Sequence, residues 1–253
     1  MSKILFHAAQ LVPGSESKNN NLFHQIIIWL YNLPHKFFAP NFTTIINCLK
    51  SDVIENNLAA ISDLERIAVT QPKYHWVIID ILSKFVRVNA ADISTKDLTV
   101  NSSTKNRQVI QAAISVISKR DSKQEPDDEQ LDLSYTDLRG LNLQGVNFQH
   151  TNLYQSNLAG VNLAGANLEG AILTAANLEG ANLNFANLSG AILSAANLDK
   201  ANLGNANLQG ANLYLASLQG AVLNDAILQG ANLRETKLSM YSREQGTGNR
   251  EQG

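Results

Sequence analysis

A single five-residue period runs through the second half of this chain and constrains its fold more than any other feature. From Leu133 to Leu238 every fifth residue is large and apolar, and all twenty-two of these positions are leucine except Phe148. Two residues before each of them stands a smaller side chain, which is alanine at all fourteen positions from Ala166 to Ala231. The frame runs without an insertion, so we interpret it as a structural repeat.

The spacing within each repeat predicts short extended segments joined by turns. In an extended chain, residues two apart point the same way, so the alanine and the leucine of one repeat face inward together. Because five is odd, a turn in every repeat must restore the direction, and glycine, which tolerates a positive φ, fills the last position ten times. A helix is excluded because this period gives no continuous helical face. The sequence therefore predicts a β-solenoid over residues 131–240, with the leucines and Phe148 buried.

The repeats also have a recurring sequence. Asparagine or aspartate precedes the leucine in sixteen of the twenty-two repeats, giving units such as Ala166-Asn167-Leu168-Glu169-Gly170. This segment resembles the pentapeptide-repeat family. The resemblance implies a right-handed quadrilateral β-helix with four pentapeptides in each coil. It implies little about function, because one fold hosts many functions.

Residues 1–125 show helical periodicity instead of the repeat. Asp52 and Glu55 have the spacing of a capping box, ahead of apolar residues at helical spacing as far as Ala68. Pro72 suits the first turn of the helix that follows. Further helices are predicted over four segments, which are Leu22–Asn32, Thr43–Leu49, Trp76–Val88 and Arg107–Ser118.

These segments predict a small α-helical bundle ahead of the solenoid, and an α+β fold overall. The stretches Leu64-Glu65-Arg66-Ile67-Ala68, Tyr74-His75-Trp76 and Leu131-Asp132-Leu133 resemble the helical region that precedes the repeats in bacterial, notably cyanobacterial, members of the family. The first coil of a solenoid exposes an open edge, so we expect residues 1–125 to form a cap or interaction domain that contacts Leu131–Phe148. The tail, residues 241–253, is polar and is expected to be disordered.

Composition and motifs argue against catalysis and metal binding. The single cysteine, Cys48, allows no intramolecular disulfide and no thiolate metal cluster, and the five histidines are scattered. No nucleophile–base arrangement, phosphate-binding loop or carboxylate pair is recognisable. The asparagines of the repeats are better explained by hydrogen bonding to turns and backbone. We therefore expect no catalytic residue, no cofactor and no metal.

Charge and hydropathy limit the partners and the compartment. A formal net charge of −2 provides no field that would attract nucleic acid or a charged membrane, so we expect no direct nucleic-acid binding. The apolar segment 22–33 falls short of the roughly 20 residues that span a bilayer. The start of the chain does not resemble a signal peptide, so the expected location is the cytoplasm.

Departures from the repeat on the outside of the coil predict a protein interface. With twenty residues in a coil, positions twenty apart stack on one face. Ile172 and Ile192 replace asparagine at the same outward position of adjacent coils, and Tyr154, Tyr214 and Leu215 lie on the same face. An exposed apolar and aromatic stripe on a polar solenoid indicates an interface. Repeat degeneracy, or coverage of the stripe by the helical bundle, remains the alternative explanation.

Two functional hypotheses follow. The first is a non-catalytic protein-interaction or scaffolding module with a regulatory role, whose partner is another protein or a second copy of this chain. The alternative comes from the resemblance, because some pentapeptide-repeat proteins imitate DNA and inhibit or protect type II topoisomerases. That mechanism needs a continuous acidic surface. Here Glu179 and Asp199 share a face, but Lys200 adjoins them.

Overall fold

The computed structural model describes residues 42–90, 100–121, 125–126 and 129–238, without the side chains of residues 100–106. The described residues from Thr43 onward belong to one compact unit. The helix predicted over Leu22–Asn32 and the tail at 241–253 lie outside the described residues.

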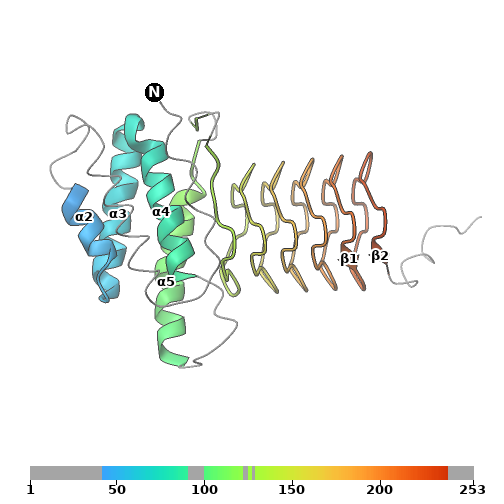
Figure 1. Cartoon of the computed structure of the whole chain (residues 1–253), viewed down its shortest axis with the longest axis horizontal. Helices are drawn as coiled ribbons and strands as arrows, with labels where there is room; N and C mark the ends of the chain where they lie inside the picture. The colour runs from blue at the N-terminus through green and yellow to red at the C-terminus, as the bar shows by residue number, and fades with distance from the viewer. Residues whose placement is uncertain (1–41, 91–99, 122–124, 127–128, 239–253) are drawn as a thin grey trace, which may run out of the picture. The chain divides into compact units, whose positions relative to one another are not determined.

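The helical region contains four α-helices and one short 3-10 helix in the described residues (Figure 1). They are α2 (Phe42–Leu49), α3 (Ile54–Thr70), η2 (Pro72–Tyr74), α4 (His75–Asn89) and α5 (Val100–Ile117). The predictions of helices in all four corresponding segments are confirmed, although α5 begins seven residues earlier than predicted. Helices α3, α4 and α5 pack on one another through apolar stripes that include Leu64, Leu82 and Ile114.

The predicted capping box at Asp52 and Glu55 is wrong. Helix α3 starts after Val53, whose side chain cannot cap it, so Glu55 stands one position too early for a box. The side chain of Asn57 instead satisfies the end of α2. Its Nδ2 atom donates to the carbonyl oxygens of Cys48 and Leu49, at 3.0 and 3.1 Å.

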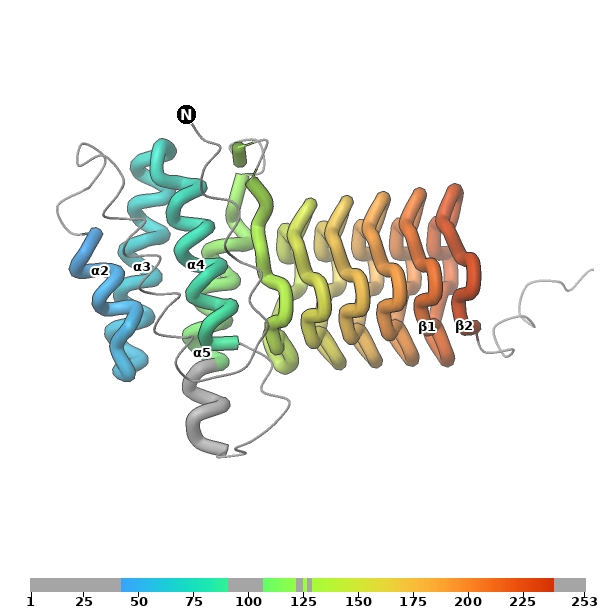
Figure 2. Tube along the Cα trace, in the orientation of Figure 1, coloured from blue at the N-terminus to red at the C-terminus, as the bar shows by residue number. Residues whose placement is uncertain are grey.

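Residues 131–238 form a stack of coils joined by parallel β-bridges between residues twenty apart (Figure 2). Four bridges form per coil, and β1 (Ser217–Leu218) and β2 (Lys237–Leu238) are the longest paired segments. Each repeat closes with a turn, as where the Ala166 N–H donates to the Leu163 carbonyl at 3.0 Å. Gly165, the third residue of that turn, has φ +66°, as a type II turn requires. The twenty-residue period and the turn in every repeat are therefore confirmed.

The interior of the coils is an apolar column, as predicted, except at its C-terminal end. The frame residues from Leu133 to Leu218, including Phe148, are buried. In the last coil, however, Leu233 and Leu238 are 37% and 50% exposed. The prediction that every leucine of the frame is buried is wrong there, because no coil of the described residues follows to cover this end.

Side chains from α5 hydrogen-bond to the open edge of the first coil. The Gln111 side chain accepts from the Asn142 N–H at 2.8 Å and donates to the Asn142 carbonyl at 3.0 Å, as a neighbouring strand would. Arg107 donates to both the carbonyl and the carboxylate of Asp137, each at 2.9 Å. Polar side chains of the helix thus replace the hydrogen bonds of a preceding coil.

Two charged groups at this junction have shifted pKa values. Arg120 is buried, donates to the carbonyls of Asn147 and Gln149, and pairs with Glu125 at 2.5 Å. Burial lowers the pKa of Arg120, and Glu125 opposes that shift. For Asp137, burial alone would raise the pKa, but hydrogen bonds from Arg139 and the charge of Arg107 outweigh it and lower the pKa.

Candidate protein interface

The five residues predicted to form an interface lie on one face of the coil stack. We call it the isoleucine face, and it consists of the repeats 131–135, 151–155, 171–175, 191–195, 211–215 and 231–235. Bridges pair Ile172 with Ile192 and join both to the asparagines of the neighbouring coils. Ile192 is 39% exposed and Leu215 is 44% exposed, whereas Tyr154, Ile172 and Tyr214 are half-buried. The structure therefore brings these side chains together in one column of stacked repeats.

The other faces show what the repeat normally does at this outward position. Each asparagine accepts a hydrogen bond from the backbone N–H two residues further on, as Asn167 does from Glu169 at 3.2 Å. At six positions of the other faces its amide also donates to the asparagine of the preceding coil. Along Asn147, Asn167, Asn187 and Asn207 the successive distances are 3.4, 3.4 and 3.2 Å. We call such a series an asparagine ladder, and it confirms the predicted structural role of these residues.

On the isoleucine face the ladder is interrupted in the middle. Asn152 donates to Asp132 at one end, and Asn232 donates to Asn212 at the other, both at 3.0 Å. Between these pairs stand Ile172 and Ile192, whose side chains carry no hydrogen-bonding group. Each isoleucine therefore removes the cap of its own turn and two links of the ladder, and leaves aliphatic surface in their place.

The corner that ends each repeat of this face is also unusual. The fifth residue of every repeat has a positive φ, and glycine provides it at ten positions. The isoleucine face has no glycine at this corner in any coil. Its six corner residues, with φ from 51° to 61°, are Tyr135, Gln155, Ala175, Ala195, Leu215 and Glu235. A left-handed conformation costs a residue with a side chain about 1–2 kcal/mol, so this face presents corner side chains at the expense of stability.

Tyr135 is a member of this face that the sequence analysis missed. It is 41% exposed, and its ring packs edge-on against Tyr154, with 5.3 Å between the ring centroids and 79° between the planes. The signal was present in the sequence, since Tyr135 occupies a fifth position at which glycine is common. The apolar residues Phe185, Val222 and Ile227 are exposed on other faces, without a second large apolar residue at the same position of an adjacent coil.

The acidic residues of the repeats are partly paired within the chain. Glu179 lies 3.4 Å from Lys200, and both side chains are largely exposed. Asp199 accepts hydrogen bonds from the Ser217 hydroxyl and from the Gln219 N–H. Within residues 129–238, these contacts do not form the continuous acidic surface that imitation of DNA would need.

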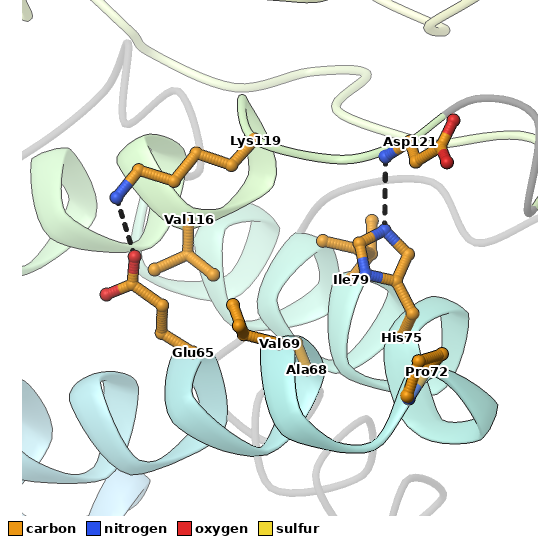
Figure 3. Close-up of a pocket in the computed structure, with 9 residues that line it drawn as sticks. All are labelled: Glu65, Ala68, Val69, Pro72, His75, Ile79, Val116, Lys119 and Asp121. Atoms are coloured by element: carbon orange, nitrogen blue, oxygen red, sulfur yellow. Dashed lines mark hydrogen bonds and ion pairs between the residues drawn. The ribbon is translucent and has the colours of Figure 1, made fainter.

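A small pocket of about 250 Å³ lies among the helices (Figure 3). Its floor is apolar, and two polar contacts flank it. Lys119 pairs with Glu65 at 2.6 Å, and the His75 Nε2 atom accepts the Asp121 N–H at 3.2 Å. The remaining lining residues are Ala68, Val69, Pro72, Ile79 and Val116. Lys119 and Glu65 pair with each other and His75 accepts a backbone N–H, so the two contacts marked in Figure 3 tie α3 and α4 to the segment 119–121.

Neither a cluster of metal-binding side chains nor a membrane-spanning helix occurs in the described part of the chain. No group of three or more histidine, cysteine, aspartate or glutamate side chains there could hold a metal ion. No helix in the same residues combines the length and the apolar character needed to cross a membrane.

Comparison with known sequences identifies the repeat region. The family model for pentapeptide repeats matches in eight copies, over residues 129–160, 156–194, 171–210 and 201–239. No protein of the curated set matches the chain. The matched residues lie outside the helical region, whose resemblance to cyanobacterial members stays a prediction.

Solved structures of three pentapeptide-repeat proteins are similar to this chain. Rfr23 from the cyanobacterium Cyanothece is 36% identical, over 45% of this chain and 68% of its own, with a TM-score of 0.28. A protein of the Arabidopsis thaliana thylakoid lumen is 32% identical, over 44% and 71%, with a TM-score of 0.22. HetL from Nostoc, which is involved in the regulation of heterocyst differentiation, is 30% identical, over 42% and 65%, with a TM-score of 0.19.

Proposed function

This chain belongs to the pentapeptide-repeat family, and we propose that it is a non-catalytic protein-interaction or scaffolding module that binds a partner through its isoleucine face. The observation that carries the proposal is the pair Ile172 and Ile192, which interrupt an asparagine ladder in adjacent coils. The pair gives up the hydrogen bonds that asparagine makes at this position and leaves apolar surface exposed in two adjacent coils. A bound partner would cover that surface and recover its hydrophobic free energy.

Three further features support an interface at this face. Tyr135 and Tyr154 place aromatic rings at one end of it, and Tyr214 and Leu215 place large side chains toward the other end. Tyrosine is enriched at protein interfaces because it combines apolar area with a hydrogen-bonding group. The corner without glycine adds side chains where glycine would be the least strained choice. The regulatory role and the cytoplasmic location remain proposals.

We also propose the domain arrangement and the finer geometry of the coil. Residues 1–125 would serve as the cap of the solenoid, residues 131–240 as the right-handed quadrilateral β-helix that the family implies, and residues 241–253 as a tail. Four bridges per twenty residues support a four-sided coil. The hydrogen bonds from Gln111 and Arg107 to the edge of the first coil support the cap.

The test is a pair of double variants that make the same chemical change on different faces. Ile172→Asn with Ile192→Asn removes the centre of the isoleucine face. Val222→Asn with Ile227→Asn is the matched control, since both residues are exposed at outward positions of other faces. Co-purification identifies other partners, and light scattering measures self-association. We expect only the first variant to lose its partner or its self-association. Unchanged mass and unchanged partners in that variant would refute the proposal.

A further inference from the structure

The backbone of the isoleucine face is already occupied by neighbouring coils. The N–H groups of Ile172 and Ile192 donate to the preceding coil, each at 2.9 Å, and the N–H groups of Leu173 and Leu193 donate to the following coil at 2.8 and 2.7 Å. The side of the stack therefore presents no open strand edge. A partner cannot add a β-strand here and must be recognised by side chains, as in the docking of an amphipathic helix.

The spacing between two tyrosines of the isoleucine face is comparable to the width of an α-helix. Tyr154 and Tyr214 stand three coils apart, which at the strand spacing of parallel sheets is about 14 Å. Between them, the two isoleucine repeats carry only small outward neighbours, which are Thr174, Ala175, Ser194 and Ala195. At the preceding corner, Gly190 has open space around it, whereas the imidazole of His150 from the coil before lies against Gly170. An α-helix with its side chains is about 10–12 Å wide, so it can lie between the tyrosines, along these two coils and parallel to their strands.

Acidic side chains flank the isoleucines on both sides. Glu169 lies just before the Gly170 corner, and Glu179 and Asp199 follow on the next face of the same two coils. Lys200 is the single basic residue of 151–210. Its contact with Glu179 is long and exposed, at 3.4 Å, so it neutralises little of this charge. Charge complementarity then requires a partner with basic flanks.

We infer that the isoleucine face takes an amphipathic α-helix of a partner protein, laid along the two coils and parallel to their strands, with its apolar stripe on Ile172 and Ile192 and with lysine or arginine at both ends of that stripe. This inference rests on the proposed function and names the class of partner. The three carboxylates of Glu169, Glu179 and Asp199 would contact the basic flanks.

The probe is a labelled synthetic peptide of about 18 residues, roughly 27 Å long as a helix, with a leucine and alanine stripe flanked by lysine and arginine. One control peptide has the same composition rearranged to destroy the stripe, and a second replaces the basic residues by glutamate. Fluorescence anisotropy at low salt measures the affinity of each peptide for the full chain. We expect the basic amphipathic peptide to bind at least about tenfold more tightly than either control, as a joint effect of the apolar centre and the flanking charge.

Variants of the full chain separate the two contributions. Ile172→Asn with Ile192→Asn should weaken binding of the basic peptide about tenfold or more, while Val222→Asn with Ile227→Asn leaves it unchanged. Glu169→Gln, Glu179→Gln and Asp199→Asn together should reduce the preference for the basic over the acidic peptide by about threefold or more. Equal binding of the rearranged peptide, or no effect of the isoleucine variant, would overturn the inference.

The outcome also distinguishes this inference from the proposed function. If the isoleucine variant loses its native partner but the wild type does not prefer the basic amphipathic peptide, the face is an interface and the helix inference is wrong. If neither the partner nor the peptide responds to that variant, both proposals fail.

Discussion

The isoleucine face and the faces with asparagine ladders share one interior but differ on the outside. Leu173 and Leu193 behind the isoleucines are as completely buried as Leu183 and Leu203 behind asparagines. The backbone register is the same on all faces, with bridges between residues twenty apart. The outer surface differs, because the isoleucine face replaces the asparagine by an aliphatic side chain in two adjacent coils and uses no glycine at its corner.

This difference separates what the fold requires from what it leaves free. The fold requires the inward leucine and a turn in each repeat, and both persist on the isoleucine face. The asparagine ladder and the corner glycine stabilise a coil but are not required. Ile172 replaces an asparagine, and Gln155 replaces a corner glycine, within an intact stack. The partner binding that we propose would account for departures that reduce stability and expose apolar surface.

The largest expected effect is on the free energy of unfolding. It tests whether the buried leucines are equally well packed behind the isoleucine face and behind the asparagine faces. Leu193→Ala on the isoleucine face and Leu203→Ala on an asparagine face should each reduce the free energy of unfolding by about 2–5 kcal/mol, because both remove a fully buried side chain. Urea unfolding of the two variants measures the losses. A much smaller loss for Leu193→Ala would show that the isoleucine face is loosely packed, and the comparison would then fail.

The next effect tests the backbone strain at the fifth residue of the repeats. Ala195 has φ +57°, so Ala195→Gly should raise the free energy of unfolding by about 1 kcal/mol. Gly190 has φ +64° and open space where a Cβ would lie, so Gly190→Ala should lower it by a similar amount through backbone strain alone. Thermal unfolding of both variants gives the signs. If both variants changed the free energy of unfolding in the same direction, the backbone strain that we assign to the isoleucine face would be contradicted.

A smaller effect concerns the interrupted ladder. Ile172→Asn with Ile192→Asn should leave the fold intact and raise the free energy of unfolding by up to about 1 kcal/mol, because each new amide can cap its own turn and bond to the next coil. Circular dichroism and urea unfolding test this prediction. A large loss of stability would show that the isoleucines serve packing within the chain.

The smallest effect concerns stability at acid pH, and it arises from Asp137 in the first coil. The pKa of Asp137 is lower in the folded chain than in the unfolded chain. Its contribution to stability is therefore complete above pH of about 4 and is lost as the pH falls through the folded pKa. Asp137→Asn should weaken the pH dependence of unfolding in this range, whereas the isoleucine variant should keep the wild-type dependence. The same profile in Asp137→Asn and the wild type would contradict this assignment.

The sequence predicted the features that depend on periodicity. The five-residue frame was enough to predict the extended segments, the turns and the buried column that contains Phe148, because every repeat has the same pattern of inward and outward residues. The register of twenty residues was implied by the resemblance to the family. The frame also identified Ile172 and Ile192 as exceptions. The role of Tyr135 could not be predicted in this way, because its ring contact with Tyr154 depends on the stacking of the first two coils.

Features that depend on contacts between distant segments could not be predicted. Gln111 and Arg107 look like ordinary polar residues of a helix, and only the three-dimensional structure places them against the edge of the first coil. The exposure of Leu233 and Leu238 likewise depends on whether another coil covers them, and their own repeats have the same leucine position as repeats in the buried interior. A periodic pattern describes the middle of a solenoid better than its two ends.

The most direct test of the account measures affinity and stability on the same proteins. The wild type, Ile172→Asn with Ile192→Asn, and Val222→Asn with Ile227→Asn are each titrated with the co-purified partner by calorimetry and unfolded in urea. The account predicts that the isoleucine variant loses at least about tenfold in affinity, as at the centre of an interface, while its stability is equal to that of the wild type or higher. Unchanged affinity, or a loss of affinity that only accompanies a loss of stability, would contradict it.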